Sequence, residues 1–219
     1  MLDPAIQYHP YERVQDYGSL PELEKVPKMV RDYLMDMPGP GYTPPDNNES
    51  YRCCLMKYLY YDGENPLAET LPTVEEKQSI VYNPNSPDKP PTEKNYRIFT
   101  QQLVSQAQTH GVTTMRIYMG RVIPTDSQTA KASVVIDFLT NGDYDSNTKT
   151  IDLSRTYAMA CLAQRALSGV NMGAGVGTFT FNRYEHADAS IQPINDEITN
   201  VGYRLTMGLT VMGSTAYGQ

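Results

Sequence analysis

The sequence predicts an α+β fold, with a mostly antiparallel sheet, one or two helices packed on one face, and an extended N-terminal arm rich in proline and tyrosine. Residues 115–123 and 132–139 are the densest runs of apolar and β-branched side chains, as expected of strands. Residues 154–167 repeat small and apolar side chains at helical spacing. Helical and strand patterns are interleaved without a repeated βαβ period, which favours an antiparallel sheet.

Residues 1–75 are expected to form the arm, and residues 76–219 the α+β structural domain. Prolines recur through the arm and interrupt long regular elements, because each one removes a backbone donor and restricts the residue before it. One helix fits between them: Pro27 suits its first turn, and apolar side chains then recur at helical spacing as far as Met37. Residues 38–48, rich in proline, glycine and asparagine, are predicted to be a linker.

The pattern between the linker and the first long strand is mixed. Residues 51–61 admit a helix or a strand, and we favour a helix. Residues 73–76 fit the cap of one helical turn, after which residues 78–82 are expected to form a strand. Thr92 suits the N-cap of a helix that continues to residue 108.

The second half of the chain is expected to complete the sheet. Asn141 and Gly142 predict a turn after the second long strand. Gly169 is expected to end the helix over residues 154–167. Residues 178–181 and 202–211 are predicted to be outer strands, joined by a long polar excursion.

Composition limits the classes of function. The 219-residue chain has a formal net charge of −7, which argues against a sequence-independent nucleic-acid binder, because such a protein needs a basic surface. No apolar run approaches the roughly 18 residues of a membrane span. The first residues lack the pattern of a signal peptide, so we expect synthesis in the cytoplasm and no membrane partner. The 17 Tyr and 11 Met, against 4 Phe and no Trp, favour surfaces that contact other proteins.

No catalytic residue, cofactor or metal ligand is predicted. Residues 143–147 begin like a calcium loop, but Thr148 and Ser154 stand where that loop needs a glycine and a bidentate glutamate, so we expect an acidic turn. The glycines within residues 173–177 are spaced as in a phosphate-binding loop. They follow a helix and precede a strand, however, and a flexible connector is therefore expected.

Two further groups of reactive side chains are interpreted as structural. His186 lies between Glu185 and Asp188, as a general base or metal ligand would, but neither a nucleophile motif nor a second histidine accompanies it. We therefore expect residues 185–188 to form a solvated polar loop. The three cysteines lack the spacing of a zinc site or a disulfide framework and are expected to be buried reduced thiols.

Seven arginines follow residue 96, several of them flanked by apolar residues. One interpretation is that their stems cover apolar surface while their charges stay in water. The other is that they pair with acidic residues of a neighbouring subunit, because arginine is favoured at interfaces. They are Arg97, Arg116, Arg121, Arg155, Arg165, Arg183 and Arg204.

The order of predicted elements over residues 76–212 resembles the small α+β neck, head-tail connector and tail-terminator proteins of tailed bacteriophages. Residues 93–99, which follow a proline-rich segment, and residues 115–118 are similar to a pattern found in phage neck proteins. The resemblance rests on element order and transfers no functional residue. It implies a virion structural protein without catalysis, made in the host cytoplasm and assembled into the virion.

The resemblance also implies the partners. The chain would form a homo-oligomeric ring that joins the portal or connector to tail tube or sheath proteins, or that stops tube growth. An acidic lumen would let DNA pass without adhering. The alternatives are a coat or filament subunit, a small enzyme that uses residues 185–188, and a binding module that uses the tyrosine-rich arm.

Overall fold

The computed structural model describes residues 21–37, 50–63, 65–83, 96–101, 112–125, 129–141, 154–173, 176–196 and 200–212. The helical elements are η1 (Pro21–Lys25), α2 (Val26–Leu34), α3 (Tyr51–Tyr60), η2 (Pro66–Ala68), α4 (Val74–Ser79) and α6 (Arg155–Leu167). The strands are β1 (Ile98–Phe99), β2 (Thr114–Pro124), β3 (Thr129–Asn141), β4 (Asn171–Gly173), β5 (Val176–Thr178), β6 (Ser190–Asp196) and β7 (Asn200–Met212).

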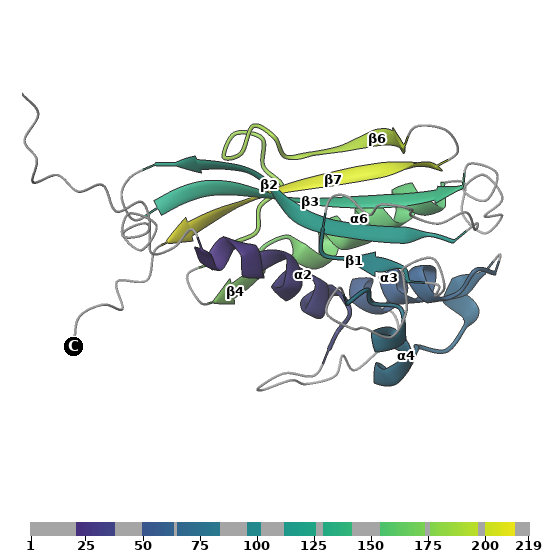
Figure 1. The fold of residues 1–219 in the computed structure, drawn as a ribbon. Helices are drawn as coiled ribbons and strands as arrows, with labels where there is room; N and C mark the ends of the chain where they lie inside the picture. The colour runs from purple at the N-terminus through teal and green to yellow at the C-terminus, as the bar shows by residue number, and fades with distance from the viewer. Residues whose placement is uncertain are drawn as a thin grey trace, which may run out of the picture.

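These strands form a single twisted sheet in the order β1-β2-β3-β7-β5-β4, with β6 also pairing with β7 (Figure 1). Every pairing between neighbouring strands is antiparallel except that of β1 with β2. β3 and β7 pair over their whole lengths, from Thr129 opposite Met212 to Asn141 opposite Asn200. The predicted fold class is therefore confirmed.

The helices cover one face of the sheet. In Figure 1, α6 lies behind the sheet, and α2 and α3 lie below it. Alternate residues of β3, among them Val134, Ile136 and Phe138, join side chains of α2, α3 and α6 in one hydrophobic core. Ala160 and Ala163 of α6 are fully buried in this core, and their small side chains let the helix approach the sheet closely.

Local sequence signals set the ends of the helices. Ser154 caps α6 by accepting a hydrogen bond from the Tyr157 N–H, and Gly169 follows the helix with a φ of 79°, a conformation that favours glycine. Thr73 and Glu76 form the predicted capping box of α4. The helix favoured for residues 51–61 is confirmed as α3.

The predicted helix over residues 92–108 is wrong at Ile98 and Phe99. Both side chains are buried, and β1 pairs with Met115 and Arg116 of β2. Pairing with a long neighbouring strand overrides a helical pattern of this length. The predicted strand over residues 78–82 is also wrong at its start, because α4 extends to Ser79 and only Val81 bridges to Ile98.

The outer-strand prediction for residues 202–211 is wrong as well. β7 lies inside the sheet, between β3 on one side and β5 and β6 on the other. β6 occupies part of the predicted polar excursion and was not foreseen, because Pro193 interrupts its alternation. Gly173 ends β4 and Val176 begins β5, and the two strands pair in antiparallel fashion, so this part of residues 173–177 is not a connector alone.

The division of the chain at residue 75 stays a prediction. Within residues 1–75, the described helices α2 and α3 share the hydrophobic core with the sheet. The predicted linker, the turn at Asn141 and Gly142, the acidic turn at residues 143–147 and most of residues 92–108 lie outside the described residues.

Candidate assembly surface

Arg155, the first residue of α6, fastens that helix to the end of α3. Its side chain is 1% exposed, and its guanidinium donates hydrogen bonds to the backbone carbonyls of Tyr58 and Tyr61 and, at 3.4 Å, of Gly63. The last carbonyls of a helix have no partner within the helix, and their partial negative charge favours a cation. Arg155 therefore satisfies the C-terminus of α3 from a neighbouring element.

Arg97, next to β1, binds the same helix end. Its Nη1 donates to the Leu59 carbonyl at 2.7 Å, and its two Nη atoms hold both carboxylate oxygens of Asp62 at 2.8 and 2.7 Å. A bidentate pair of this kind fixes orientation as well as distance. The two arginines together lock α3 to the sheet and to α6.

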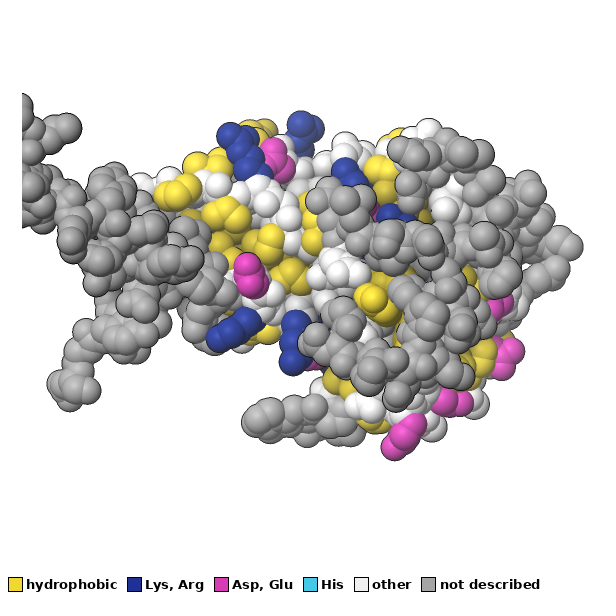
Figure 2. Space-filling model, viewed as in Figure 1, with side chains coloured by type: hydrophobic (Ala, Val, Ile, Leu, Met, Phe, Trp, Pro, Cys, Tyr) yellow, Lys and Arg dark blue, Asp and Glu magenta, His cyan; other side chains and the backbone are white. Residues whose placement is uncertain are grey.

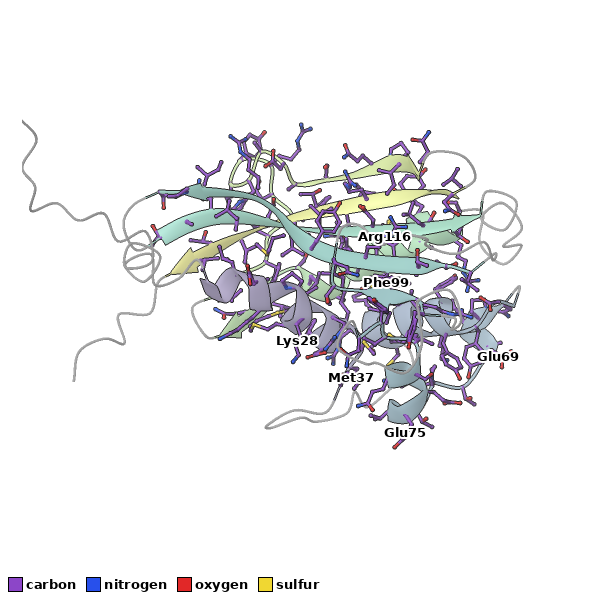
Figure 3. All side chains as sticks on the ribbon, viewed as in Figure 1. Lys28, Met37, Glu69, Glu75, Phe99 and Arg116 are labelled. Carbon is purple, nitrogen blue, oxygen red and sulfur yellow. The ribbon has the colours of Figure 1, made fainter. Side chains whose placement is uncertain are left out.

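A charged row crosses the sheet on the face away from α6. Arg116, Asp137 and Arg204 are paired in register on β2, β3 and β7, and the label in Figure 3 marks Arg116 on the front face. Arg204 holds both oxygens of the Asp137 carboxylate, at 2.7 and 2.8 Å, and the Tyr118 hydroxyl donates to the same carboxylate at 2.9 Å. Burial, and then the nearby Asp137 carboxylate, raise the pKa of Tyr118, so its hydroxyl stays protonated and donates.

These contacts correct, for part of the set, the interpretation that the arginine charges stay in water. Arg97, Arg116 and Arg155 are buried, and the partners described for Arg97, Arg155 and Arg204 belong to the same chain. These contacts stiffen one subunit, and pairing of the arginines with a neighbouring subunit stays a prediction. Arg121, Arg165 and Arg183 are exposed.

A second ionic group joins the C-terminus of α2 to the N-terminus of α3. Asp36, whose φ is 54°, is buried, and its Oδ1 lies 2.8 Å from Nη1 of Arg52. The guanidinium of Arg52 also lies over the ring of Tyr33, 4.7 Å from its centroid. Burial lowers the pKa of nearby Lys77, although the Asp36 carboxylate opposes this shift.

The loop that carries His186 folds back on the sheet. An Asn182 side chain accepts a hydrogen bond from the Tyr184 N–H at 3.0 Å, and the Lys131 ammonium donates to the Glu185 carbonyl at 3.3 Å. The His186 ring packs so closely on β7 that a Cβ added to Gly208 would lie 2.0 Å from it. Burial, and then Lys131, lower the pKa of His186. The arrangement uses the imidazole as a packing surface.

The described residues include no group of three or more His, Cys, Asp or Glu side chains that could hold a metal ion. Cys53 is buried, Cys54 and Cys161 are half-buried, and none of them forms a disulfide. Within the part of the chain that the structure describes, no helix is long and apolar enough to cross a membrane.

The far end of the β2–β3 hairpin carries an apolar surface. Ile123 is 41% exposed and Pro124 is exposed at the end of β2, whereas Met119 and Val122 are half-buried and pack against the core; we call these four residues the hairpin surface. Figure 2 shows hydrophobic side chains gathered over this end of the front face. A β-bulge between Met119 and Val122 bends the strand where the surface begins. Ile123 and Pro124 therefore expose apolar area at the end of a long paired strand, where it is open to contact with another protein.

Prolines lie at the outer edges of the sheet. The Thr180 and Gly208 backbones exchange hydrogen bonds of 2.9 and 3.0 Å, so the backbone groups of Gly208 point towards the side of β7 where β6 lies. These groups alternate in direction along β7, so those of Tyr203, opposite Pro193, point to the other side. The nitrogen of Pro193 in β6 therefore faces the outer edge. The Thr125 N–H donates to the Thr129 carbonyl, which places the nitrogen of Pro124 on the outer edge of β2. A proline nitrogen cannot donate, so neither Pro124 nor Pro193 offers a backbone donor to an added strand.

An open groove of about 480 Å³ lies beside α2, and we call it the α2 groove. Its apolar lining consists of Met35, Met37, Val81 and Tyr82. Its polar lining consists of Lys28, Arg31, Asp32, Gln78, Asn83 and Thr100. In Figure 3, Lys28 and Met37 lie along the lower side of α2 and at its C-terminal end.

The model of the YomW family matches residues 54–208. The chain belongs to the YomW family. The family takes its name from a phage genome, of the Bacillus phage SPBc2 type, and this supports a phage-encoded protein. A search of curated proteins and a search of solved structures found no significant match.

The YomW match runs from within α3 to within β7. It therefore includes both arginine locks, the charged row and the hairpin surface, whereas α2 lies before it. Sequence reasoning placed the hairpin residues in a strand and gave them no function. The sequence did carry one signal for a contact surface: the apolar residues Val122 and Ile123 continue to the end of the strand, directly before Pro124.

Proposed function

We propose that this YomW-family protein is a virion structural protein, a ring-forming neck, head-tail joining or tail-terminator component that acts by oligomerisation and docking. The observation that carries the proposal is the hairpin surface, where Ile123 and Pro124 expose apolar side chains at the end of a continuous sheet. A neighbouring subunit that covers Ile123 and Pro124 would remove apolar area from water at about 25 cal/mol per Å².

The internal ionic contacts support the same role. Arg155 and Arg97 hold α3 in place, and the Asp137 row links three strands. A subunit that must keep one shape while it transmits force between a head and a tail benefits from such locks. Because the locks act within one subunit, the contact between subunits is left to apolar surface.

The blocked edges favour a discrete assembly over a filament of paired strands. Pro124 and Pro193 each face the outer edge of the sheet without a donor, so addition of further strands is disfavoured. A contact between two different surfaces of identical subunits closes into a ring when its rotation closes. The net charge of −7 would let DNA pass through such a ring without adhering.

The test compares two aspartate substitutions by light scattering coupled to size-exclusion chromatography. Ile123→Asp places a charge on the hairpin surface. Val201→Asp is the matched control, because Val201 is 37% exposed on β7, at the opposite end of the sheet from the hairpin turn. We expect the wild-type chain and the control to form the same discrete oligomer, and Ile123→Asp to shift towards the monomer. A wild-type monomer at high concentration would contradict the proposal, and filaments would favour a coat or filament subunit.

The absence of catalysis is part of the proposal and has its own control. His186→Ala removes the imidazole of residues 185–188 while Lys131 stays in place. We expect purified particles carrying this variant to contain the chain and to keep their infectivity. Assembled particles that have lost a measurable activity would favour the enzyme alternative.

A further inference from the structure

Residues 182–188, which we call the Tyr184 loop, hold one aromatic ring entirely in water. The Tyr184 side chain is 101% exposed, the highest value among the exposed large apolar and aromatic side chains of the described residues. The loop beneath it is held in shape by hydrogen bonds. The Asn182 carbonyl accepts from the N–H groups of Glu185 and His186 at 3.1 and 2.9 Å, and the Asn182 side chain accepts from the Tyr184 N–H at 3.0 Å. None of these bonds uses the Tyr184 ring or hydroxyl.

A ring presented in this way suits a contact between proteins. Because the loop already has its shape, binding orders few groups and loses little conformational entropy. Tyrosine and arginine are enriched among the residues that contribute most to protein interfaces, and Arg183, next to Tyr184, is also exposed. The loop adjoins the hairpin surface, because Lys131 lies opposite Ile123 in register and its ammonium donates to the Glu185 carbonyl at 3.3 Å.

The α2 groove has the size and the lining to receive such a ring. Its volume of about 480 Å³ lies within the range of roughly 300–1,000 Å³ that is typical of binding pockets. Met35, Met37 and Tyr82 give it adaptable and amphipathic walls. The Tyr82 ring is itself supported by the rings of Tyr96 and Phe99, with centroids 5.4 and 5.6 Å away. An incoming aromatic ring would extend this cluster.

The charges of the two surfaces are opposite in sign. In the groove, Arg31 is held by Asp32 at 2.6 Å, so the exposed Lys28 leaves the lining with a net charge of +1. The Tyr184 loop carries one arginine and two carboxylates, a net charge of −1 with a neutral histidine. Opposite charges favour the encounter of the two surfaces and fix their orientation.

The sheet separates the Tyr184 loop from the groove of the same chain. The loop packs through its His186 ring on Gly208 of β7. The residues on either side of Gly208 belong to the hydrophobic core, so by alternation the loop lies on the face away from the core. α2 lies on the other face, where Val30 and Leu34 join that core. In Figure 1, the yellow-green loop before β6 lies above the sheet and α2 lies below it. A Tyr184 ring that fills the groove therefore comes from another copy.

We infer that the Tyr184 loop of one subunit docks in the α2 groove of a second copy, with the Tyr184 ring against Met35, Met37 and Tyr82. This inference rests on the proposed function, since it needs a neighbouring copy, and it names the surface that receives the side of the subunit with the hairpin surface. Contact between two different surfaces of identical subunits runs head to tail, which is the form that closes into a ring.

The experiment replaces Tyr184 with p-benzoylphenylalanine, an aromatic residue that bonds under near-ultraviolet light to C–H groups in contact with it. Labelled chains of natural isotope content and of ¹⁵N content are unfolded, mixed in equal amounts and refolded together. Cross-linked peptides are then read by mass spectrometry. We expect links to residues 28–37 or 78–83, and about half of them should join two different isotopes if copies mix at random.

Three outcomes would overturn the inference. Links of one isotope only would place the ring against its own chain, links to other residues would assign it another contact, and the absence of links in an assembled sample would leave it without one. The same photoreactive residue at Leu67, which is 38% exposed on η2, is the matched control and should not link to the groove.

Substitutions at Tyr184 separate this inference from the proposed function. Tyr184→Ala removes the ring and keeps the backbone hydrogen bond of residue 184, and we expect it to need about tenfold higher concentration to assemble. Tyr184→Phe, which keeps the ring, and Leu67→Ala should stay within about twofold of the wild type. Equal assembly of Tyr184→Ala and the wild type would overturn the inference and leave the proposed function intact. A wild-type chain that is monomeric at high concentration would overturn both.

Discussion

Replacing Arg155 with alanine is the sharpest test of how α3 is held. The substitution removes a fully buried guanidinium that donates to the backbone carbonyls of Tyr58 and Tyr61 and reaches that of Gly63. It also removes the cation that lies 5.4 Å from the centroid of the Tyr58 ring. The Tyr58 and Tyr61 carbonyls would then lose this donor.

The expected loss follows from the number of acceptors. A hydrogen bond from a charged donor contributes about 1.5–3 kcal/mol, and a buried acceptor left without a partner costs about 1–3 kcal/mol. Because Gly63 is exposed, water can replace the bond to its carbonyl, so only the two tyrosine carbonyls count. We expect Arg155→Ala to lower the free energy of unfolding by about 3–5 kcal/mol.

Equilibrium unfolding in urea, followed by circular dichroism and tyrosine fluorescence at one fixed protein concentration, measures this loss. Arg155→Lys should recover less than half of it, because one ammonium cannot reach the carbonyls that a planar guanidinium spans. Arg165→Ala is the control on the same helix: Arg165 is exposed and lies 5.6 Å from the centroid of the Tyr51 ring, and its removal should cost about 0.5 kcal/mol. An Arg155→Ala loss below about 1 kcal/mol would refute the reasoning.

Three further predictions concern the sheet and the loop on it. Tyr118→Phe should cost about 1–2 kcal/mol in urea unfolding, because it removes only the hydroxyl that donates to Asp137; an unchanged midpoint would contradict this. The lowered pKa of His186 means that the unfolded chain binds its proton first as the pH falls below about 6.5, so the folded state loses stability from there down to the folded-state pKa. His186→Gln should therefore lose less stability than the wild type between pH 7.5 and pH 5, and equal losses would count against this burial. Gly202→Ala should prevent normal folding, seen as a loss of soluble protein and of strand signal, because its methyl would lie 1.8 Å from the Phe138 carbonyl oxygen; a native-like spectrum would be inconsistent with the β3–β7 pairing.

The elements that sequence reasoning found are those whose signals are local. The two long strands alternate or concentrate β-branched side chains, and α6 has a capping serine before it and a glycine after it. The capping box of α4 was also readable, because Thr73 and Glu76 are three residues apart. Such signals depend only on residues that are close together in the sequence.

The elements that could not be predicted from the sequence depend on partners that are distant in the chain. Ile98 and Phe99 became a strand because Met115 and Arg116 offered a pairing edge, and β7 became an interior strand because β6 added to its far side. Nothing in the residues near β1 shows this. Pro193 lies within β6, and its nitrogen faces the open edge, where no donor is needed.

The same contrast between local signals and distant partners applies to the residues of the candidate surface. That several arginines are flanked by apolar residues was visible in the sequence, but whether they pair within a chain or between chains depends on where α3 ends. Arg155 and Tyr58 are 97 positions apart, and no periodicity connects them. The hairpin surface likewise needed the register of β2 on β3, which shows that Ile123 lies beyond the cover of the helices.

The central claim is that identical subunits assemble into a closed ring through the hairpin surface. Native mass spectrometry of the purified chain, with negative-stain images of the same sample, tests it most directly. A single stoichiometry and annular particles are predicted, both lost in Ile123→Asp and kept in Val201→Asp. A single mass equal to one chain at every concentration, or the same rings in both variants, would contradict it.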